Sequence, residues 1–285
     1  MPCYAITGAS KGIGLEFVRQ LAANEANTVL AIVRDPSSKD ISDLASNHTN
    51  LHVVKGDVTD PKSMIDAAST AAAVTDGKLD VLIQNSNAVD LPSMPLTPSQ
   101  LPFDAQAIRE MFDPPLSTGV YGGLWATNAF LPLIEKGDQK KIVHISSVVA
   151  TPDFVNKSGL DSAVPYSVAK LGMNVLVAKY AAELAPKGIK VLALSPGWVD
   201  TTGGRWSILL TAARSTDYAI AVDKAAREIQ MQGSMVQKFQ RVQPGLQGPI
   251  QPEESVSKSL QVIEHLDAQS SGLLLSHNGD NKSWF

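Results

Sequence analysis

The chain has 285 residues, of which 44% are hydrophobic and 18% are charged, a balance typical of a globular protein with a sizeable core. A formal net charge of −4 without a long basic run argues against a nucleic-acid partner. No apolar stretch approaches the roughly 20 residues of a transmembrane helix, and the first residues lack the pattern of a signal peptide. The single cysteine, Cys3, fits a reducing compartment. We therefore expect a cytoplasmic protein with no membrane partner.

Apolar strand-like runs alternate with helical patterns along the chain. The predicted strands are Tyr4–Thr7, Thr28–Val33, Leu51–Lys55, Val81–Gln84, Ile142–Ile145, Lys190–Ser195 and Leu273–Ser276. The predicted helices are Leu15–Ala23, Ile41–Ser46, Pro61–Val74 and Tyr166–Leu184. Repeated strand–helix–strand units imply parallel strands joined by right-handed crossovers. We expect a doubly wound α/β fold of the Rossmann type, with about seven parallel strands in a single domain over residues 1–285.

Three long connections interrupt this alternation, and each follows the carboxyl end of a predicted strand. They are Ala88–Asp104, Val148–Pro165 and Trp198–Pro249, the last with a helical pattern over Ser215–Met235. Open α/β sheets bind ligands at the carboxyl ends of their strands, and long loops there are often lids. We interpret residues 198–249 as a substrate lid within the single domain.

A glycine-rich segment joins the first predicted strand to the first predicted helix. Glycines permit a tight turn and let backbone N–H groups approach a phosphate, while the helix start adds partial positive charge. Any tight strand–helix turn can use glycine, but this position in an α/β chain favours a nucleotide site. The residues that we expect to bind the nucleotide here are Gly8, Ser10, Lys11, Gly12, Ile13 and Gly14.

Two basic residues refine the choice of nucleotide. Lys11 lies inside the glycine segment, and Arg34 ends the second strand, where the adenosine ribose of a dinucleotide would lie. An arginine there can pair with a 2′-phosphate, whereas an acid would bond a 2′-hydroxyl. Asp35 would favour NAD if it turned inward, and both cations could also be solvated surface residues. We expect NADP(H) as the cofactor.

A tyrosine and a lysine one helical turn apart open the longest predicted helix. An ammonium beside a phenol favours the phenolate and lowers the pKa of the phenol. Such a tyrosine can act as a general acid toward a carbonyl or as a base toward an alcohol. Ser147, at the end of the preceding strand, can hydrogen-bond the same substrate oxygen. We predict Ser147, Tyr166 and Lys170 as the catalytic residues.

Several further motifs occur in a fixed order along the chain. They are Thr7–Gly14, Gly56–Val58, Asp80–Asn85, Ile145–Ser147, Tyr166–Lys170 and Ser195–Thr201. In this order the sequence resembles the short-chain dehydrogenase/reductase superfamily over nearly its whole length. Within it, Val33–Pro36, Gln251–Ser255 and Asn278–Asp280 resemble the C-factor-like and norsolorinic acid ketoreductase-like subgroup.

The resemblance implies roles for matching positions. Tyr166 would be the acid/base, Lys170 its partner and a ligand of the nicotinamide ribose, and Ser147 the residue that orients the substrate oxygen. The cofactor would also contact Arg34, Asp57, Val58, Asn85, Pro196, Gly197, Val199 and Thr201. The resemblance further implies a homodimer or homotetramer built on the helices around Phe130 and Leu176.

The expected activity is NADPH-dependent reduction of a ketone to an alcohol, or the reverse, on a small-molecule substrate, with secondary metabolism as one setting. The alternatives are a non-redox cyclisation, isomerisation or dehydration on the same fold, and an NADP-binding regulator. Retention of Ser147, Tyr166 and Lys170 favours the redox activity.

The sequence also departs from the family pattern. Residues 84–87 read Gln-Asn-Ser-Asn where the family usually has Asn-Asn-Ala-Gly. Gly119 falls where the family has a helix asparagine that holds a relay water, so either Asn128, Thr118, a backbone carbonyl or water substitutes for it, or turnover is slow. Phe154–Ser162 reads as an insertion beside the substrate pocket. His144 is expected to be a packed histidine, and no metal site is expected, because the histidines lack ligand spacing.

Overall fold

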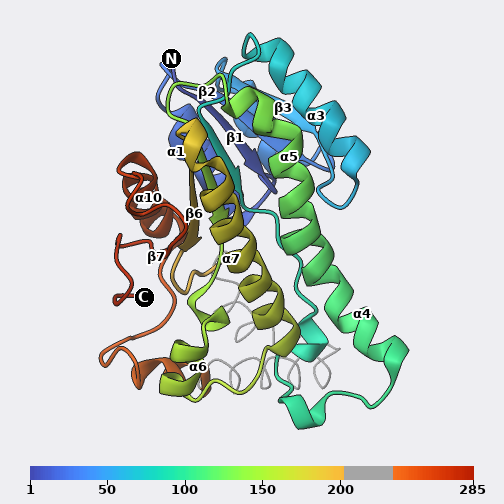
Figure 1. Ribbon diagram of the computed structural model, residues 1–285, viewed down its shortest axis with the longest axis vertical. Helices are drawn as coiled ribbons and strands as arrows, with labels where there is room; N and C mark the ends of the chain where they lie inside the picture. The colour runs from blue at the N-terminus through green and yellow to red at the C-terminus, as the bar shows by residue number, and fades with distance from the viewer. Residues whose placement is uncertain (202–233) are drawn as a thin grey trace, which may run out of the picture.

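A parallel sheet of seven strands organises the protein (Figure 1), in a computed structural model that describes residues 1–201 and 234–285. The strand order is β3-β2-β1-β4-β5-β6-β7. The strands are β1 (Cys3–Thr7), β2 (Thr28–Val33), β3 (Leu51–Lys55), β4 (Val81–Gln84), β5 (Lys141–Ile145), β6 (Lys190–Ser195) and β7 (Leu274–Ser276). The order reverses between β1 and β4, which creates the switch point where α/β sheets bind ligands.

The strands form where the sequence is apolar on both sides of the backbone. In β2 every residue after Thr28 is buried, as expected when helices cover both faces of a parallel sheet. Each neighbouring pair is parallel, and the register sets Ile6 beside Ala31 and Ile83. All seven strand predictions are confirmed, with bounds that differ by at most one residue.

Helices cover both faces of the sheet. They are α1 (Gly12–Ala22), α2 (Lys39–Ser46), α3 (Pro61–Val74), α4 (Ala105–Pro115), α5 (Gly122–Ile134), α6 (Pro152–Ser158), α7 (Val164–Leu184) and α10 (Pro252–Glu264). One hydrophobic cluster joins α3, α5 and α7 to the sheet, and a second joins α1, α2 and α10 to the opposite face. The doubly wound fold in a single domain is therefore confirmed.

The residue pattern alone did not predict four helices, although the family resemblance implied a helix around Phe130, which is α5. Two of them, α4 and α5, lie between β4 and β5 and are joined by a π-helical turn, Leu116–Tyr121. Prolines at the end of α4 obscure a continuous helical pattern, although Asp104 caps its start by accepting from the N–H of Ala107 at 2.8 Å. The other two are α6, inside the connection after β5, and α10, near the end of the chain.

The expected lid is only partly within the described structure. The helical pattern predicted over Ser215–Met235 falls almost wholly outside the described residues. After that gap, residues 234–240 are helical, and Ile250 pairs with Val199 in a parallel bridge. In residues 1–201 and 234–285, no helix has both the length and the apolar character needed to cross a bilayer.

Candidate active site

The glycine segment forms a tight turn between β1 and α1. Gly8 and Gly12 have φ angles of +66° and +56°, which glycine adopts readily and other residues rarely do. A Cβ atom at Gly14 would lie 2.3 Å from the carbonyl oxygen of Gly8, so only glycine fits at this first turn of α1. The turn therefore leaves the start of α1 open to an approaching anionic group.

Asn85 holds this turn from the end of β4. Its amide donates to the carbonyl oxygens of Gly8 at 3.1 Å and Thr7 at 3.3 Å. The Thr7 hydroxyl in turn accepts from the backbone N–H groups of Asn85 and Ser86. The unusual Gln-Asn-Ser-Asn segment thus still joins β4 to the turn, and the Asn85 side chain supports the turn as well as facing the cavity.

A cavity of about 760 Å³ extends from the glycine turn across the carboxyl ends of the strands. Of the expected cofactor-binding residues, those that line it are Gly8, Ser10, Lys11, Gly12, Ile13, Arg34, Asp57, Val58, Asn85, Tyr166, Lys170, Pro196 and Thr201. Residues that are more than 190 positions apart in the sequence therefore line the same cavity.

Four expected site residues do not line this cavity. Gly14 packs beneath the glycine turn, and Ser147 contacts Tyr166 instead. Gly197, with φ of +87°, lies against the imidazole of His277, where a Cβ atom would be 2.9 Å from Cε1. Val199 lies in the bridge to Ile250.

The end of β2 presents a cation to the cavity. Arg34 lines the cavity together with Lys11. The neighbouring Asp35 carboxylate accepts hydrogen bonds from the Ser37 backbone at 2.9 Å and the Ser37 hydroxyl at 2.6 Å, and these bonds lower the pKa of Asp35. Asp35 also lines the cavity, but one of its carboxylate oxygens is engaged in its own turn, and Arg34 is the residue of this pair suited to an anionic group.

Tyr166 and Lys170 project from the first turns of α7 toward the carboxyl end of β5. The Lys170 Nζ atom lies 5.8 Å from the centre of the Tyr166 ring and donates to the carbonyl oxygen of Ile145 at 2.6 Å. The Ser147 side chain hydrogen-bonds Tyr166. The structure thus brings the three predicted catalytic residues together.

Burial shifts the pKa values of Tyr166 and Lys170. It lowers the pKa of Lys170 to about 7, because the side chain is only 3% exposed. Burial also raises the pKa of Tyr166 above its usual value, and the Ser147 hydrogen bond only partly opposes this rise. The expected lowering of the tyrosine pKa by Lys170 is therefore wrong for the protein without cofactor. The physical reason is that the lysine ammonium bonds the Ile145 carbonyl, while desolvation disfavours the phenolate.

Gly119 lies in the π-helical turn before α5, a type of distortion that is frequent at functional sites. It is buried, yet a Cβ atom built on it would meet no heavy atom within 4 Å outside the local helix backbone. Thr118, beside it, lines the cavity. Asn128 does not replace the relay asparagine of the family. Its side chain, on α5, instead accepts a hydrogen bond from the hydroxyl of Tyr180 on α7 at 2.7 Å.

An aromatic group forms part of the apolar cluster on which Tyr166 packs, and sequence reasoning missed it. It consists of Phe154, Trp198, Phe239 and Phe285, and Tyr166 packs against it. The rings of Phe239 and Phe285 stack with centres 4.6 Å apart, and Phe154 meets both edge-on. Residues from the insertion, the lid and the chain end are thus assembled beside the tyrosine.

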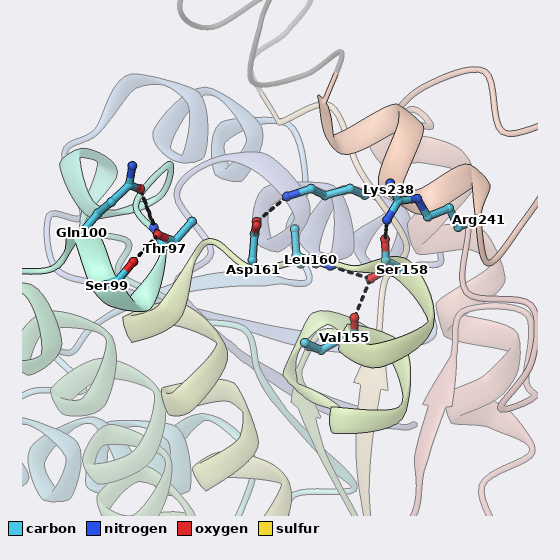
Figure 2. Close-up of polar contacts among 9 residues, drawn as sticks. All are labelled: Thr97, Ser99, Gln100, Val155, Ser158, Leu160, Asp161, Lys238 and Arg241. Carbon is cyan, nitrogen blue, oxygen red and sulfur yellow. Dashed lines mark hydrogen bonds and ion pairs between the residues drawn. The ribbon is translucent and has the colours of Figure 1, made fainter.

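Polar contacts fasten the insertion to the segment that follows the gap (Figure 2). Lys238 forms an ion pair with Asp161, and the Arg241 guanidinium donates to the carbonyl oxygen of Ser158 at 3.2 Å. We call these two contacts the α6 clasp. Gly159, with φ of +70°, leaves the room that Arg241 occupies, because a Cβ atom there would lie 2.5 Å from Nη1. The spacing of these residues in the sequence offers no pattern that could have predicted the clasp.

Comparison with known proteins decides the family. The model of the short chain dehydrogenase family matches residues 3–208. The chain belongs to the short-chain dehydrogenase/reductase superfamily, a family of oxidoreductases.

Within the described residues, no group of three or more histidine, cysteine, aspartate or glutamate side chains could hold a metal ion.

Fungal members of this superfamily are similar over their whole length. The short-chain dehydrogenase/reductase atnB of Arthrinium sp. is 39% identical over 98% of both chains. AacuF of Aspergillus aculeatus is 39% identical over the full length of both chains. Among solved structures, the NADPH-bound carbonyl reductase from chicken fatty liver superposes with a TM-score of 0.74 at 26% identity, covering 100% of this chain and 99% of that one.

Proposed function

We propose that this dehydrogenase/reductase uses NADPH to reduce a ketone to an alcohol, or catalyses the reverse oxidation. The observation that carries the proposal is that Tyr166 and Lys170, with Ser147 against the tyrosine, lie at a cavity that also reaches the glycine turn and Arg34. The carbonyl reductase from chicken fatty liver, which is similar in fold and binds NADPH, supports the same chemistry.

The residues present fit an NADP(H) molecule. The cavity volume lies within the range of cofactor sites, and the glycine turn offers a cradle that a Cβ atom would fill. Gly8, Ser10, Lys11, Gly12 and Ile13 would surround the pyrophosphate, with Gly14 shaping the turn beneath. The remaining contacts would come from Arg34 at the 2′-phosphate and from Asp57, Val58, Asn85, Pro196, Gly197, Val199 and Thr201. When bound, NADPH supplies the hydride that the reduction requires.

The side chains of the trio would manage the proton. The raised pKa of Tyr166 keeps its phenol protonated near neutral pH, so the hydroxyl can donate to the oxygen of a ketone. Ser147 would hydrogen-bond the same oxygen and hold the tyrosine hydroxyl in place. Lys170, with a pKa of about 7, would be partly charged at neutral pH and would stabilise the phenolate left after proton donation. The protonated phenol favours reduction over oxidation.

The setting of the reaction belongs to the same proposal. A small-molecule ketone in secondary metabolism is the substrate class that we favour. The fungal relatives, which are short-chain dehydrogenases/reductases of similar length, support the oxidoreduction itself. We also propose a cytoplasmic homo-oligomer in which residues 198–249 close over the substrate as a lid.

NADPH consumption tests the proposal directly. Purified protein is incubated with NADPH and a panel of aliphatic, aromatic and polycyclic ketones, and NADPH absorbance and product are both measured. Tyr166→Phe should lower kcat by at least about 100-fold, because it removes the proton donor. Tyr4→Phe is the matched control, since Tyr4 lies in β1, away from the cavity lining.

Two outcomes would contradict the proposal. If Tyr166→Phe retains full activity, the tyrosine is not the acid. If product forms while NADPH is not consumed, the protein catalyses a non-redox reaction, such as a cyclisation, isomerisation or dehydration, on the same fold.

A further inference from the structure

His144 is fully buried beneath the catalytic lysine. It belongs to β5 and faces the side of the sheet that α5 and α7 cover, as does Ile142 two residues earlier. Its imidazole packs on Gly123 of α5, where a Cβ atom would lie 3.3 Å from Cε1 and 3.4 Å from Nδ1. The absence of a side chain at Gly123 therefore leaves the room that the imidazole uses.

The two ring nitrogens of His144 have no hydrogen-bond partner among the described residues. A neutral imidazole carries one donor and one acceptor, and a buried polar group without a partner is costly. Gln84, its register partner on β4, directs its amide to the Gly123 carbonyl at 3.2 Å and the Thr127 hydroxyl at 2.9 Å. The buried ring nitrogens of His144, which lack a protein partner among the described residues, therefore point to a small polar ligand beside them.

Lys170 lies close to this imidazole. Its ammonium donates to the carbonyl oxygen of Ile145, the residue after His144. Burial, reinforced by the charge of Lys170, lowers the pKa of His144 to about 3, so the imidazole is neutral and can accept a hydrogen bond. An ammonium has three N–H donors, and the contact to Ile145 uses one of them.

A small hollow lies beside Gly119, one helical turn from the residue on which the imidazole packs. Gly119 precedes Gly123 by about one helical turn, so the two glycines lie along the same face of the helix. Gly119 is buried, but nothing lies within 4 Å of the place where its Cβ would be. On one side of the hollow the neighbouring Thr118 lines the main cavity, and one helical turn away Gly123 contacts the imidazole.

We propose that His144 is a positioning residue for Lys170 and that a water molecule enclosed beside Gly119 connects them. The water accepts a hydrogen bond from the Lys170 ammonium and donates one to the imidazole. This arrangement holds the ammonium toward Tyr166 and favours its charged form. The inference rests on the role proposed above for Lys170 in the reaction.

The pH dependence of turnover distinguishes positioning from simple packing. His144→Phe keeps the size of the ring but removes the acceptor, so the pKa of Lys170 should fall and the alkaline loss of kcat should move to lower pH by about one pH unit. His144→Asn retains an acceptor and should restore much of the wild-type profile. Tyr166 on α7 and His144 on β5 are the titratable groups beside the ammonium, and Lys170 is the one charged group acting on His144 among the described residues. An unchanged profile in His144→Phe overturns the proposal.

Gly119→Ala provides a second test that does not alter the histidine. Alanine is favoured over glycine in a helix, and the methyl group meets no neighbour, so a purely structural role predicts an equal or higher Tm and normal turnover. If the hollow holds the connecting water, the methyl group displaces it. We then expect the same alkaline shift as in His144→Phe with the Tm preserved, and normal turnover at every pH overturns the proposal.

A measurement on the cofactor-free protein separates this inference from the proposed activity. In protein with ¹⁵N-labelled histidine, the ring resonances of His144 should shift in both Gly119→Ala and Lys170→Met, because both changes disrupt the same hydrogen bonds. His265→Gln, at an exposed position, assigns one other histidine and should leave the His144 signals in place. If His144 signals stay unmoved in both variants, the connection does not exist, whether or not the protein reduces a ketone.

Discussion

Lys170 and Tyr166 lie one helical turn apart, and burial moves their pKa values in opposite directions. Each shift follows from the cost of placing a charge in a poorly solvated site, which favours neutral lysine and neutral phenol alike. In the proposed reaction, this pair would therefore give a proton to a ketone oxygen more readily than it would take one from an alcohol. A similar cost applies to His144, which is neutral in the folded protein and charged in acid when unfolded.

Arg34 should determine the preference between the two nicotinamide cofactors. In Arg34→Ala the affinity for NADPH should fall by about tenfold or more, because a charge-assisted contact to the 2′-phosphate is lost. The affinity for NADH should change little. Titration of both cofactors by fluorescence measures the two dissociation constants, and Lys39→Ala is the control, an exposed nearby cation outside the cavity lining. Equal losses for NADPH and NADH would refute the role of Arg34.

The buried imidazole of His144 should make the protein sensitive to acid. Its pKa is about 3 in the folded chain and near 6.5 when unfolded, so the unfolded state binds the additional proton between these values. Stability is therefore lost as the pH falls below 6.5, by about 1.4 kcal/mol for each pH unit until the folded pKa is reached. Urea unfolding at pH 7.5 and pH 5 should show about 2 kcal/mol less loss in His144→Phe than in wild type. A loss of the same size in both proteins would contradict this prediction, and His265→Gln serves as the exposed control.

At the scale of elements, short helices and turns outside the sheet shape the substrate side of the site. Helix α6 begins at Pro152 after the Thr151 cap and ends at Gly159 in the left-handed conformation. It carries Phe154 into the aromatic cluster, while the α6 clasp joins it to the chain that follows the gap. Residues 152–161 and 238–241 are therefore joined beside the apolar cluster on which Tyr166 packs.

Breaking the clasp should loosen these joined segments without unfolding the protein. The hydrogen bond from the exposed Arg241 side chain to the Ser158 carbonyl contributes about 1 kcal/mol, so Arg241→Met should lower the free energy of unfolding only slightly. Amide hydrogen exchange over residues 152–163 should accelerate by about tenfold, because opening of this region becomes easier. Lys258→Met removes a comparable cation, paired with Glu254 on α10, and should leave this region unaffected. Unchanged exchange in Arg241→Met would show that packing alone holds α6.

At the scale of the whole molecule, a stripe of apolar side chains remains on the outer face of two neighbouring helices. These exposed residues are Tyr121, Leu124, Val168, Leu171 and Val175. The helices around Phe130 and Leu176, on which the family resemblance places the subunit contact, are α5 and α7; the Phe130 side chain itself is buried in the core, and Leu176 is partly buried. Contiguous exposed apolar side chains of this kind are typical of protein–protein contacts.

The stripe predicts a homodimer in which α5 and α7 of two subunits pack together. Light scattering after size exclusion should give the mass of a dimer or of a tetramer for wild type, and Leu171→Glu with Val175→Glu should dissociate this contact because it places charges in an apolar interface. Ile65→Glu, on an exposed position of α3, is the control and should keep the wild-type mass. A wild-type monomer at micromolar concentration would rule out the predicted contact.

The sequence by itself determined the strands, the glycine turn and the spacing of Tyr166 and Lys170. Each of these depends on neighbouring residues: apolar runs make buried parallel strands, glycines allow positive φ angles, and one helical turn separates the phenol from the ammonium. Helices α4 and α5 were harder to predict from the sequence, because Pro114 and Pro115 interrupt the helical pattern and a π-helical turn joins the two helices.

Only the tertiary structure decided the pKa values of the site residues and which distant residues pack around them. The rise in the Tyr166 pKa and the turn of Asp35 toward Ser37 depend on burial and on individual hydrogen bonds. The aromatic cluster and the α6 clasp join residues far apart in the chain, and no local pattern encodes such contacts. The orphaned nitrogens of His144 likewise become visible only when β5, α5 and α7 are packed together, because solvation is a property of the folded surroundings and not of the residue alone.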